Sequence, residues 1–260
     1  MNYLKCTRMN NKIFLETSVQ IKKIFGKERE SILNFIEDKK TITSTYVLME
    51  FNRRILKDCI YLYSILTEEE TLDDVFGRLA ELKRYEYRRA IICYSILSKL
   101  SEGGKLEKEE ASINLKMLMD YQLKRQFDYG IKSVVDETKC ELANEKIKEE
   151  NNNYLLNTSC RRGKMKCEIE KFVEGNKKEV EYIMKGLKLN EEFKNVCNSL
   201  REVLNDSKKA MGKNCNRILG DCIISVETPK DYKILTTDHH YEIICKCIDK
   251  DTLLLQKLNL

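Results

Sequence analysis

The chain has 260 residues, enough for one substantial hydrophobic core with an added lobe and too few for a second large independent domain. Its 42% hydrophobic and 34% charged residues are typical of a soluble globular protein, and no apolar run approaches the roughly 20 residues that span a bilayer. Composition therefore argues against a membrane protein, and the net charge of +5 permits a nucleic-acid partner without requiring one.

The start of the chain, MNYLKCTRMNNKIFL, is too polar for a secretory signal, which predicts a cytoplasmic protein. An odd number of cysteines, 11, scattered along such a chain does not indicate a disulfide framework. We expect most of them to be reduced thiols that pack as small apolar residues.

The N-terminal part alternates between strand and helix patterns. KIFL at 12–15 fits a buried parallel strand, and SVQIKKIFG after it has helical spacing. A second helix is predicted over 28–38. TIT at 41–43 is the next strand candidate, and a long helix should follow, capped by Ser44 or Thr45.

From about residue 68 to about 214 the sequence is highly charged, with helical periodicity and no convincing strand. Helices are expected up to the break at SEGGK (101–105), and then at about 106–128, 176–186 and 190–212. We interpret residues 67–207 as an all-helical insertion, because a compact domain would not tolerate so long a structureless loop.

The C-terminal part returns to alternation. LGDCIISVE at 219–227 fits either a strand or a short buried helix, and KILTT at 233–237 fits a strand. HHYEIICKCI then predicts a helix with Ile243 and Ile244 facing inward, and TLLLQKL at 252–258 is a candidate last strand.

This organisation predicts one parallel α/β domain, made of 1–66 and 208–260 and interrupted by the helical insertion. In open parallel sheets, ligands gather outside the carboxyl ends of the strands. Two acidic residues occupy that position, since Glu16 directly follows KIFL and Asp238 directly follows KILTT.

Two further carboxylates could reach the same edge. Asp221 begins an element after Gly220, and Glu50 lies about one and a half turns into the helix after TIT. Magnesium and manganese prefer oxygen ligands, and a pair of such ions can activate water and stabilise the leaving oxygen of a phosphodiester. Because like charges repel, gathering four carboxylates without a metal would be costly.

Four stretches carry these acids in order: IFLETSV (13–19), TSTYVLMEFNR (43–53), LGDCIISVE (219–227) and ILTTDHHYEII (234–244). They resemble the four acidic motifs of the PIN-domain family of metal-dependent nucleases. The resemblance implies a three-layer α/β/α fold with a parallel sheet that cuts RNA. It also implies that the catalytic and metal-binding residues are Glu16, Glu50, Asp221 and Asp238, which would hold one or two Mg²⁺ or Mn²⁺ ions.

The resemblance covers about residues 12–58 and 215–258. It also implies roles for two hydroxyls beside the acids, those of Thr17 and Thr236. The family usually has aspartate as its first acid, whereas Glu16 is one methylene longer, so whether Glu16 supports activity stays open.

The cysteine pairs Cys160/Cys167 and Cys215/Cys222 each enclose six residues, whereas zinc knuckles normally use gaps of about two to four. Buried thiols are the expected role, and a four-cysteine zinc site is the alternative. The first pair encloses a basic loop suited to phosphate contacts, with Arg161, Arg162, Lys164 and Lys166. Together with Arg53, these four are candidate substrate-binding residues.

Three other patterns have two interpretations each. KRYEYRRAIICY (83–94) interleaves basic and aromatic residues that could grip RNA, but on a helix they would spread around the cylinder. His239 and His240 point about 100° apart on a helix, so we interpret both as solvated helix-start residues. The i, i+4 spacing of Glu50, Arg54 and Asp58 also fits a surface ion ladder.

The sequence thus predicts a metal-dependent endoribonuclease. The alternative is a catalytically weak PIN-like module that binds RNA or protein. The expected partner is RNA, single-stranded or structured, and not a membrane. The helical insertion could recruit a protein partner, and a homodimer is compatible with the sequence.

Overall fold

The protein is described from a computed structural model, which covers residues 11–101, 104–150, 153–157, 160, 167–212 and 214–258. Its centre is a five-stranded sheet in which every pair of neighbours is parallel. The strands are β1 (Lys12–Leu15), β2 (Lys40–Ser44), β3 (Ser133–Val135), β6 (Lys233–Thr236) and β7 (Thr252–Leu254). The spatial order is β3-β2-β1-β6-β7. The chain therefore builds outward from β1 in both directions, and the topological switch point lies between β1 and β6.

Side chains of the strands alternate between two apolar layers. On one face, Ile13 and Leu15 of β1 pack with α1 (Thr17–Phe25) and α2 (Arg29–Ile36). On the other face, Phe14 packs into a core shared by α3 (Thr45–Phe51), α12 (Gly220–Glu227) and α13 (His240–Lys246). The protein is thus an α/β protein whose parallel sheet has helices on both faces, compatible with a three-layer α/β/α arrangement.

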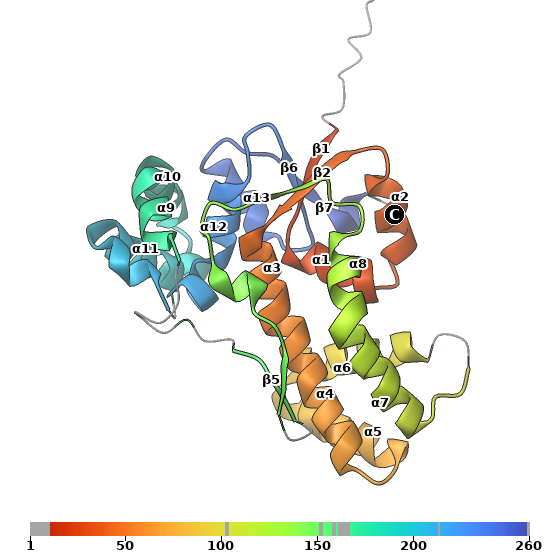
Figure 1. The fold of residues 1–260 in the computed structure, drawn as a ribbon. Coiled ribbons are helices and arrows are strands. Elements are labelled where there is room, and N and C mark those ends of the chain that lie inside the picture. Colours follow the sequence, from red (N-terminus) through yellow and green to blue (C-terminus); the bar gives the residue numbers. More distant parts are fainter. Residues whose placement is uncertain are drawn as a thin grey trace, which may run out of the picture.

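The helix after β2 is long and leaves the sheet. It continues from α3 through a π-helical segment, η1 (Asn52–Leu56), into α4 (Lys57–Glu68). There it meets α5 (Leu72–Tyr85), α6 (Tyr87–Leu100), α7 (Lys108–Met117), the π-helical η2 (Leu118–Gln122) and α8 (Leu123–Asp128). Figure 1 shows these helices below the sheet. Their buried side chains belong to the same core cluster as those under α3 and α12.

The sequence pattern suggested uninterrupted helix up to SEGGK, and this is wrong at Glu86. There the backbone leaves the helical region, with φ −128° and ψ 62°, and separates α5 from α6. No glycine or proline marks the break. The two helices then pack against each other, so that Val75 and Leu79 of α5 and Cys93 of α6 become buried in one cluster.

The expectation of no strand between residues 68 and 214 is also wrong. β3 joins the sheet beside β2, and a separate antiparallel pair forms from β4 (Lys148–Glu150) and β5 (Asn153–Leu155). β3 is largely exposed, so it lacks the apolar pattern of a buried strand. The division into residues 1–66 with 208–260 and an inserted 67–207 stays a prediction.

The remaining helices are α9 (Ile169–Gly175), α10 (Lys177–Leu187) and α11 (Lys194–Asn205). In Figure 1 they lie to one side of the sheet, next to α12 and α13. Short 3-10 and π turns connect the elements: η3 (Glu141–Asn144), η4 (Glu191–Phe193), η5 (Ser207–Ala210), η6 (Asn214–Ile218) and η7 (Leu255–Lys257). The stretch 219–227 is helix α12 rather than a strand, and the last strand is shorter than predicted because η7 replaces its second half.

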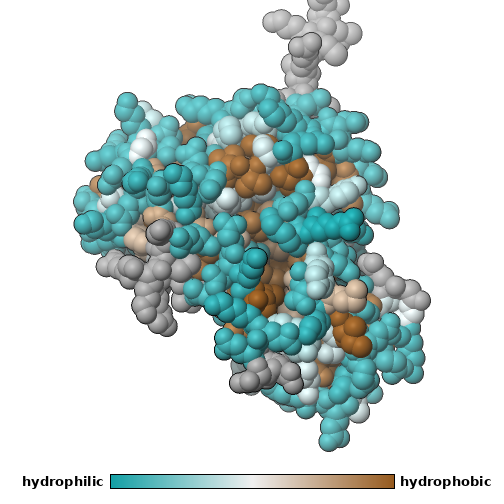
Figure 2. All heavy atoms as spheres, viewed as in Figure 1, coloured by the Kyte–Doolittle hydropathy of each residue, from teal (hydrophilic) through white to brown (hydrophobic). Residues whose placement is uncertain are grey.

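Figure 2 shows mostly polar residues on the face seen in Figure 1, with one apolar patch over the sheet and a smaller apolar strip where α3 and α4 lie beside α7 and α8. A groove there is lined by apolar residues such as Leu48, Met119 and Ile147. In the described part of the chain, no helix combines the length and the apolar character needed to cross a membrane.

Candidate metal centre

A cleft of about 1050 Å³ opens at the carboxyl edge of β1 and β6, where the sheet topology switches direction. All four acids singled out from the sequence line it: Glu16, Glu50, Asp221 and Asp238. Asp221 and Glu50 come from α12 and α3, Glu16 directly follows β1, and Asp238 is the second residue after β6. Parallel strands therefore bring together residues that are more than 200 positions apart in the chain.

Glu16 is the most buried of these acids, with 3% of its surface exposed. Its carboxylate caps α1, because it accepts hydrogen bonds from the backbone amides of Ser18 at 2.7 Å and Val19 at 3.3 Å. The Ser18 hydroxyl donates to the Oε1 atom of Glu16, the same oxygen that accepts from Val19, and also lies 2.6 Å from the hydroxyl of Thr237. Burial raises the pKa of Glu16 to about 7, against the opposing effect of the Ser18 hydrogen bonds.

Glu50 projects from α3 toward the start of α12. The Thr17 hydroxyl donates to its carboxylate at 2.7 Å, and burial raises the pKa of Glu50 although Arg54 acts in the opposite direction. A Cβ atom at Gly220 would lie only 2.7 Å from the Glu50 Oε1 atom. Glycine at position 220 is therefore what lets the carboxylate of Glu50 pack against the helix that carries Asp221.

Asp221, Asp238 and His240 form the tightest polar group in the cleft. Each offers one ligand atom, and these atoms all lie within 4.8 Å of one another. The Nδ1 atom of His240 is 3.4 Å from Asp238 Oδ1 and 3.8 Å from Asp221 Oδ2. Two carboxylate oxygens and an imidazole nitrogen are a donor set that suits a divalent transition-metal ion, so the three residues can together hold a metal.

The interpretation of His240 as a solvated bystander is wrong. Its Nε2 atom lies 2.9 Å from Glu192 Oε1, and its ring packs edge-on against Phe193, with 5.1 Å between ring centroids. The interaction with Asp221 is the main cause that raises the pKa of His240 to about 9. At neutral pH its proton compensates the two aspartates, and a metal ion bound there would displace that proton. His239 instead pairs with Glu242 near the surface.

The opposite wall of the cleft comes from the helices below the sheet. Tyr87, Arg88 and Ile91 of α6 face it, together with Arg54 of η1. Tyr87 is 60% exposed. Neither Arg54 nor Arg88 forms an ion pair with a residue that the structure describes, whereas the adjacent Arg89 pairs with Asp58 and Glu86. Two cations without an ion-pair partner among the described residues, and an aromatic ring, thus line the same cleft as the acidic group, and Arg54 acts through its charge on Glu50.

These placements settle several alternatives from the sequence. The ion ladder of Glu50, Arg54 and Asp58 does not form among the described residues, because the partner of Asp58 is Arg89. The 83–94 stretch supplies Tyr87 and Arg88 to the cleft. The basic loop with Arg161, Arg162, Lys164 and Lys166 lies outside the described residues.

The structure also places the remaining residues that the sequence analysis singled out. Thr236 is fully buried and accepts a hydrogen bond from the amide of Asp238 at 2.9 Å, which fixes the turn that presents this acid. Arg53 is partly buried, with Nη1 3.9 Å from Met49 Sδ, and does not line the cleft. Ile244 is buried as expected, whereas Ile243 is 36% exposed and faces the cleft.

Sequence reasoning missed three contributors, His240, Glu192 and Ser18. The spacing Asp-x-His at a helix start could have indicated His240, because an acid preceding the helix and a first-turn residue can approach the same point. No local signal indicates Glu192, which comes from η4 and reaches His240 only through tertiary packing.

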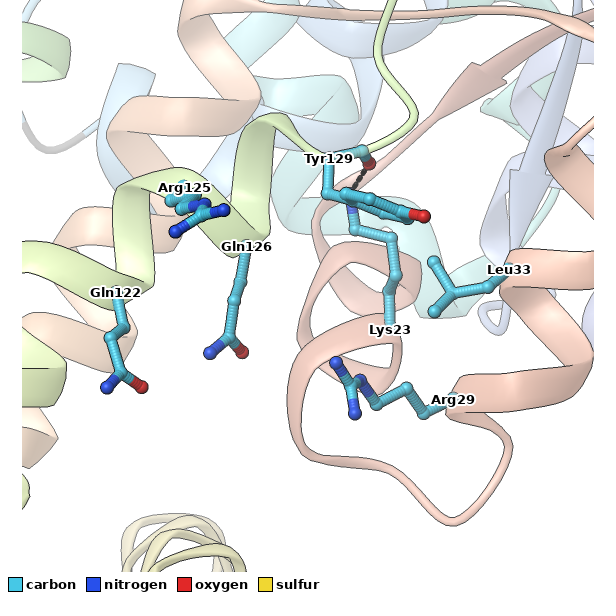
Figure 3. Close-up of a pocket in the computed structure, with 7 residues that line it drawn as sticks. All are labelled: Lys23, Arg29, Leu33, Gln122, Arg125, Gln126 and Tyr129. Atoms are coloured by element: carbon cyan, nitrogen blue, oxygen red, sulfur yellow. Dashed lines mark hydrogen bonds between the residues drawn. The ribbon is translucent and has the colours of Figure 1, made fainter.

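A second cavity, of about 470 Å³, lies beside α1 and α8 and shares no lining residue with the cleft. Figure 3 shows its side chains, with Arg29 on one side and Gln126 on the other. Its lining includes no carboxylate and three basic residues, Lys23, Arg29 and Arg125. Lys23 is 2% exposed, and its ammonium donates to the carbonyls of Phe127 at 2.7 Å and Tyr129 at 2.9 Å.

Comparisons of this chain with protein-family models, with curated proteins and with solved structures give no match. The class of the protein therefore follows from its own geometry: an α/β protein with a candidate metal centre at the switch point of a parallel sheet.

Proposed function

We propose that the protein is a metal-dependent endoribonuclease of the PIN-like type, with its active site in the cleft between the sheet and α6. The observation that carries the proposal is the pairing of two surfaces across one cleft. A candidate acidic metal centre forms one wall, and Arg54 and Arg88, which have no ion-pair partner among the described residues, form the other with the exposed Tyr87. An RNA strand needs both, a cationic surface for its phosphates and a site for phosphodiester chemistry.

Asp221, Asp238 and His240 would hold the metal, and Glu50 lies close enough to Asp221 for its charge to act on the same site. Mn²⁺ or Mg²⁺ is the proposed cofactor, and the imidazole favours Mn²⁺ of the two. When bound, such an ion lowers the pKa of water and stabilises charge on a leaving oxygen. One ion accounts for the triad, and a second would need Glu16 or Glu50 as a ligand.

The chain's own residues would then orient the substrate. Arg54 and Arg88, which line the cleft, would bind phosphates of the strand, and the ring of Tyr87 would stack on an unpaired base. Stacking on an exposed ring requires a splayed base, so the arrangement favours single-stranded RNA over a duplex. Thr17 would hold the carboxylate of Glu50 in place through its 2.7 Å hydrogen bond.

The test is cleavage of end-labelled single-stranded RNA in the presence of Mn²⁺, with direct titration of Mn²⁺ by calorimetry. Wild-type protein should cut, and an Asp221→Asn, Asp238→Asn double variant should neither cut nor bind Mn²⁺. Asp251→Asn is the matched control, because Asp251 is an exposed carboxylate whose recorded partner is Lys233. Intact RNA with wild-type protein under all metal conditions would refute the nuclease.

A second candidate is a module that binds RNA, or a protein through its helices, without cutting. It is favoured by Glu16, both of whose carboxylate oxygens accept hydrogen bonds from Ser18 or Val19 at the start of α1. A carboxylate held in this way has little freedom to coordinate a second ion. RNA binding that survives in the double variant, with no cleavage by wild type, would support this candidate.

A further inference from the structure

Four cysteines from three separate segments meet beyond the end of β3. Cys140 precedes η3, Cys160 and Cys167 flank the basic loop, and Cys215 lies in η6. The amide of Glu168, next to Cys167, donates to the carbonyl of Thr138 at 2.8 Å. A Cβ atom at Gly212 would lie 3.9 Å from the carbonyl oxygen of Cys160. The chain thus brings the segments around 140, 160, 167 and 215 to one place.

The thiols of these residues interact with one another. The thiol of Cys167 donates to the carbonyl of Thr138 at 3.6 Å, and Cys140 and Cys167 line the same small cavity. The interaction with Cys167 holds the pKa of Cys140 below its ordinary value. Cys160 and Cys215 are near enough to act on Cys140 through their charge, and Cys215 is affected in the same way by Cys167 and Cys160. All four are free thiols.

We propose that Cys140, Cys160, Cys167 and Cys215 bind one zinc ion as a tetrathiolate site. Zinc in structural sites is tetrahedral and is often held by four cysteines from loops that have little other reason to be ordered. The sequence suggested Cys222 as the fourth member of such a site, but Cys222 lies in α12, where its thiol interacts with those of Cys197, Cys245 and Cys247. Cys140 takes its place.

Two features beside the cluster fit a thiolate site. The hydroxyl of Thr138 is buried and has no hydrogen-bond partner in the described part of the chain, so it can donate to a sulfur two residues away in sequence. Lys139 has a φ of 43°, a left-handed conformation that non-glycine residues adopt rarely and that costs energy. This turn directs Cys140 back toward Cys167. A metal bond to Cys140 would offset that cost.

Charge also fits. A zinc ion with four thiolates carries a net charge of about −2. The six residues between Cys160 and Cys167 include four basic ones in the sequence and no acidic one. Among the described residues, no three of these sulfur atoms lie within 4.8 Å of one another, so zinc must draw the segments inward. Cys140, Cys160 and Cys167 lie outside helices and strands, so no regular hydrogen-bond ladder opposes such a shift.

The second group of thiols provides the contrast. Cys197 and Cys245 are on α11 and α13, and Cys222 is on α12. Cys245 donates to the Ser225 hydroxyl at 3.4 Å and Cys197 to the Met184 carbonyl at 3.9 Å. Cys197, Cys222 and Cys245 are all on helices packed in the core, whereas three of the four proposed zinc ligands lie outside helices and strands, so this group serves as the internal control.

The zinc site would fix the segment that leads into α12, the helix that carries Asp221. Cys215 is six residues before Asp221, and its carbonyl accepts a hydrogen bond from the hydroxyl of Tyr46. That hydroxyl would lie 3.6 Å from a Cβ atom at Gly220. Fixing Cys215 therefore fixes the entry to the helix that presents Asp221, and it fixes both ends of the basic loop.

The experiment is elemental analysis of protein purified under reducing conditions from zinc-supplemented cells, followed by replacement of zinc with Co²⁺. We expect about one zinc per chain and the intense sulfur-to-cobalt absorption of a tetrahedral tetrathiolate. Cys140→Ser and Cys167→Ser should lose the zinc, and Cys222→Ser should retain it. If the serine variants do not fold, metal content and cobalt spectrum of the wild type decide the matter.

Three results would overturn the proposal: wild type without zinc, equal zinc loss in Cys222→Ser, or a cobalt spectrum without thiolate bands. The Asp221→Asn, Asp238→Asn variant should keep its zinc. This outcome separates the cysteine site from the candidate centre in the cleft, so failure of either proposal leaves the other standing.

Discussion

Replacing Lys23 with methionine should change how the stability of the protein depends on pH. The ammonium of Lys23 is buried between α1 and the end of α8, and its recorded hydrogen-bond partners are two backbone carbonyls rather than a carboxylate. Burial lowers the pKa of Lys23 to about 7, with the charge of Asp128 acting weakly in the opposite direction. In the unfolded chain the same amine has its ordinary pKa of 10.5.

The sign follows from proton binding. Between pH 7 and 10.5 the unfolded state holds a proton on Lys23 that the folded state has released, so stability rises with pH across this window. Where the two states differ by one full proton, each pH unit adds about 1.4 kcal/mol to the free energy of unfolding. Because the folded group is half protonated at pH 7, the gain from pH 7 to pH 9 is about 2 kcal/mol.

The assay is urea unfolding of wild type and Lys23→Met at pH 7, 8 and 9 with a reductant present. Other titrating groups are shared, so the difference between the two proteins isolates Lys23. That difference should increase by about 2 kcal/mol over this range. Lys27→Met, at an exposed position on the loop after α1, is the control. A difference that stays constant from pH 7 to pH 9 would refute the reasoning, because it would mean that the two carbonyls keep the ammonium charged.

Three further outcomes are expected. Arg88→Ala should weaken binding of single-stranded RNA and lower the slope of log affinity against log salt by about 0.7, the value for one lost phosphate contact, in filter-binding titrations. Gly220→Ala should displace the carboxylate of Glu50, because the added Cβ would lie 2.7 Å from it, and should reduce cleavage while the thermal midpoint changes little. Arg89→Ala should destabilise the protein by about 3 kcal/mol in urea unfolding, because it leaves the buried carboxylate of Asp58 without its 2.9 Å partner.

Some of the fold was predictable because it depends on local pattern. β1 has the predicted bounds, β2 is one residue longer than predicted at each end, and β6 is one residue shorter at its end. A parallel strand covered on both faces is a short continuous apolar run, which local pattern can reveal. β3 was not predictable in this way. Its three residues are mostly exposed, and they form a strand because β2 offers a free edge at that point.

The break at Glu86 was hidden for a related reason. Charged residues with good helix propensity surround it, so the local sequence favours continuation. What favours the break is packing, because α5 and α6 bury Val75, Leu79 and Cys93 only when the chain reverses. The same reversal brings Tyr87 and Arg88 to the cleft. Helical periodicity alone did not predict this, because it distributes these side chains around the whole helix.

The candidate site was predicted in position but not in composition. The four acids line one cleft, yet the three groups within metal-binding reach of one another include a histidine and exclude Glu16. The difference lies in how the carboxylate of Glu16 is held. Both of its oxygens accept hydrogen bonds from Ser18 or Val19, where Glu16 caps α1. Asp238 makes the equivalent turn on the neighbouring strand with a shorter side chain and accepts from the amide of His240 at 2.9 Å, which keeps the imidazole beside the acid. In this structure the acid after β1 thus anchors a helix, and the acid after β6 positions the third potential ligand.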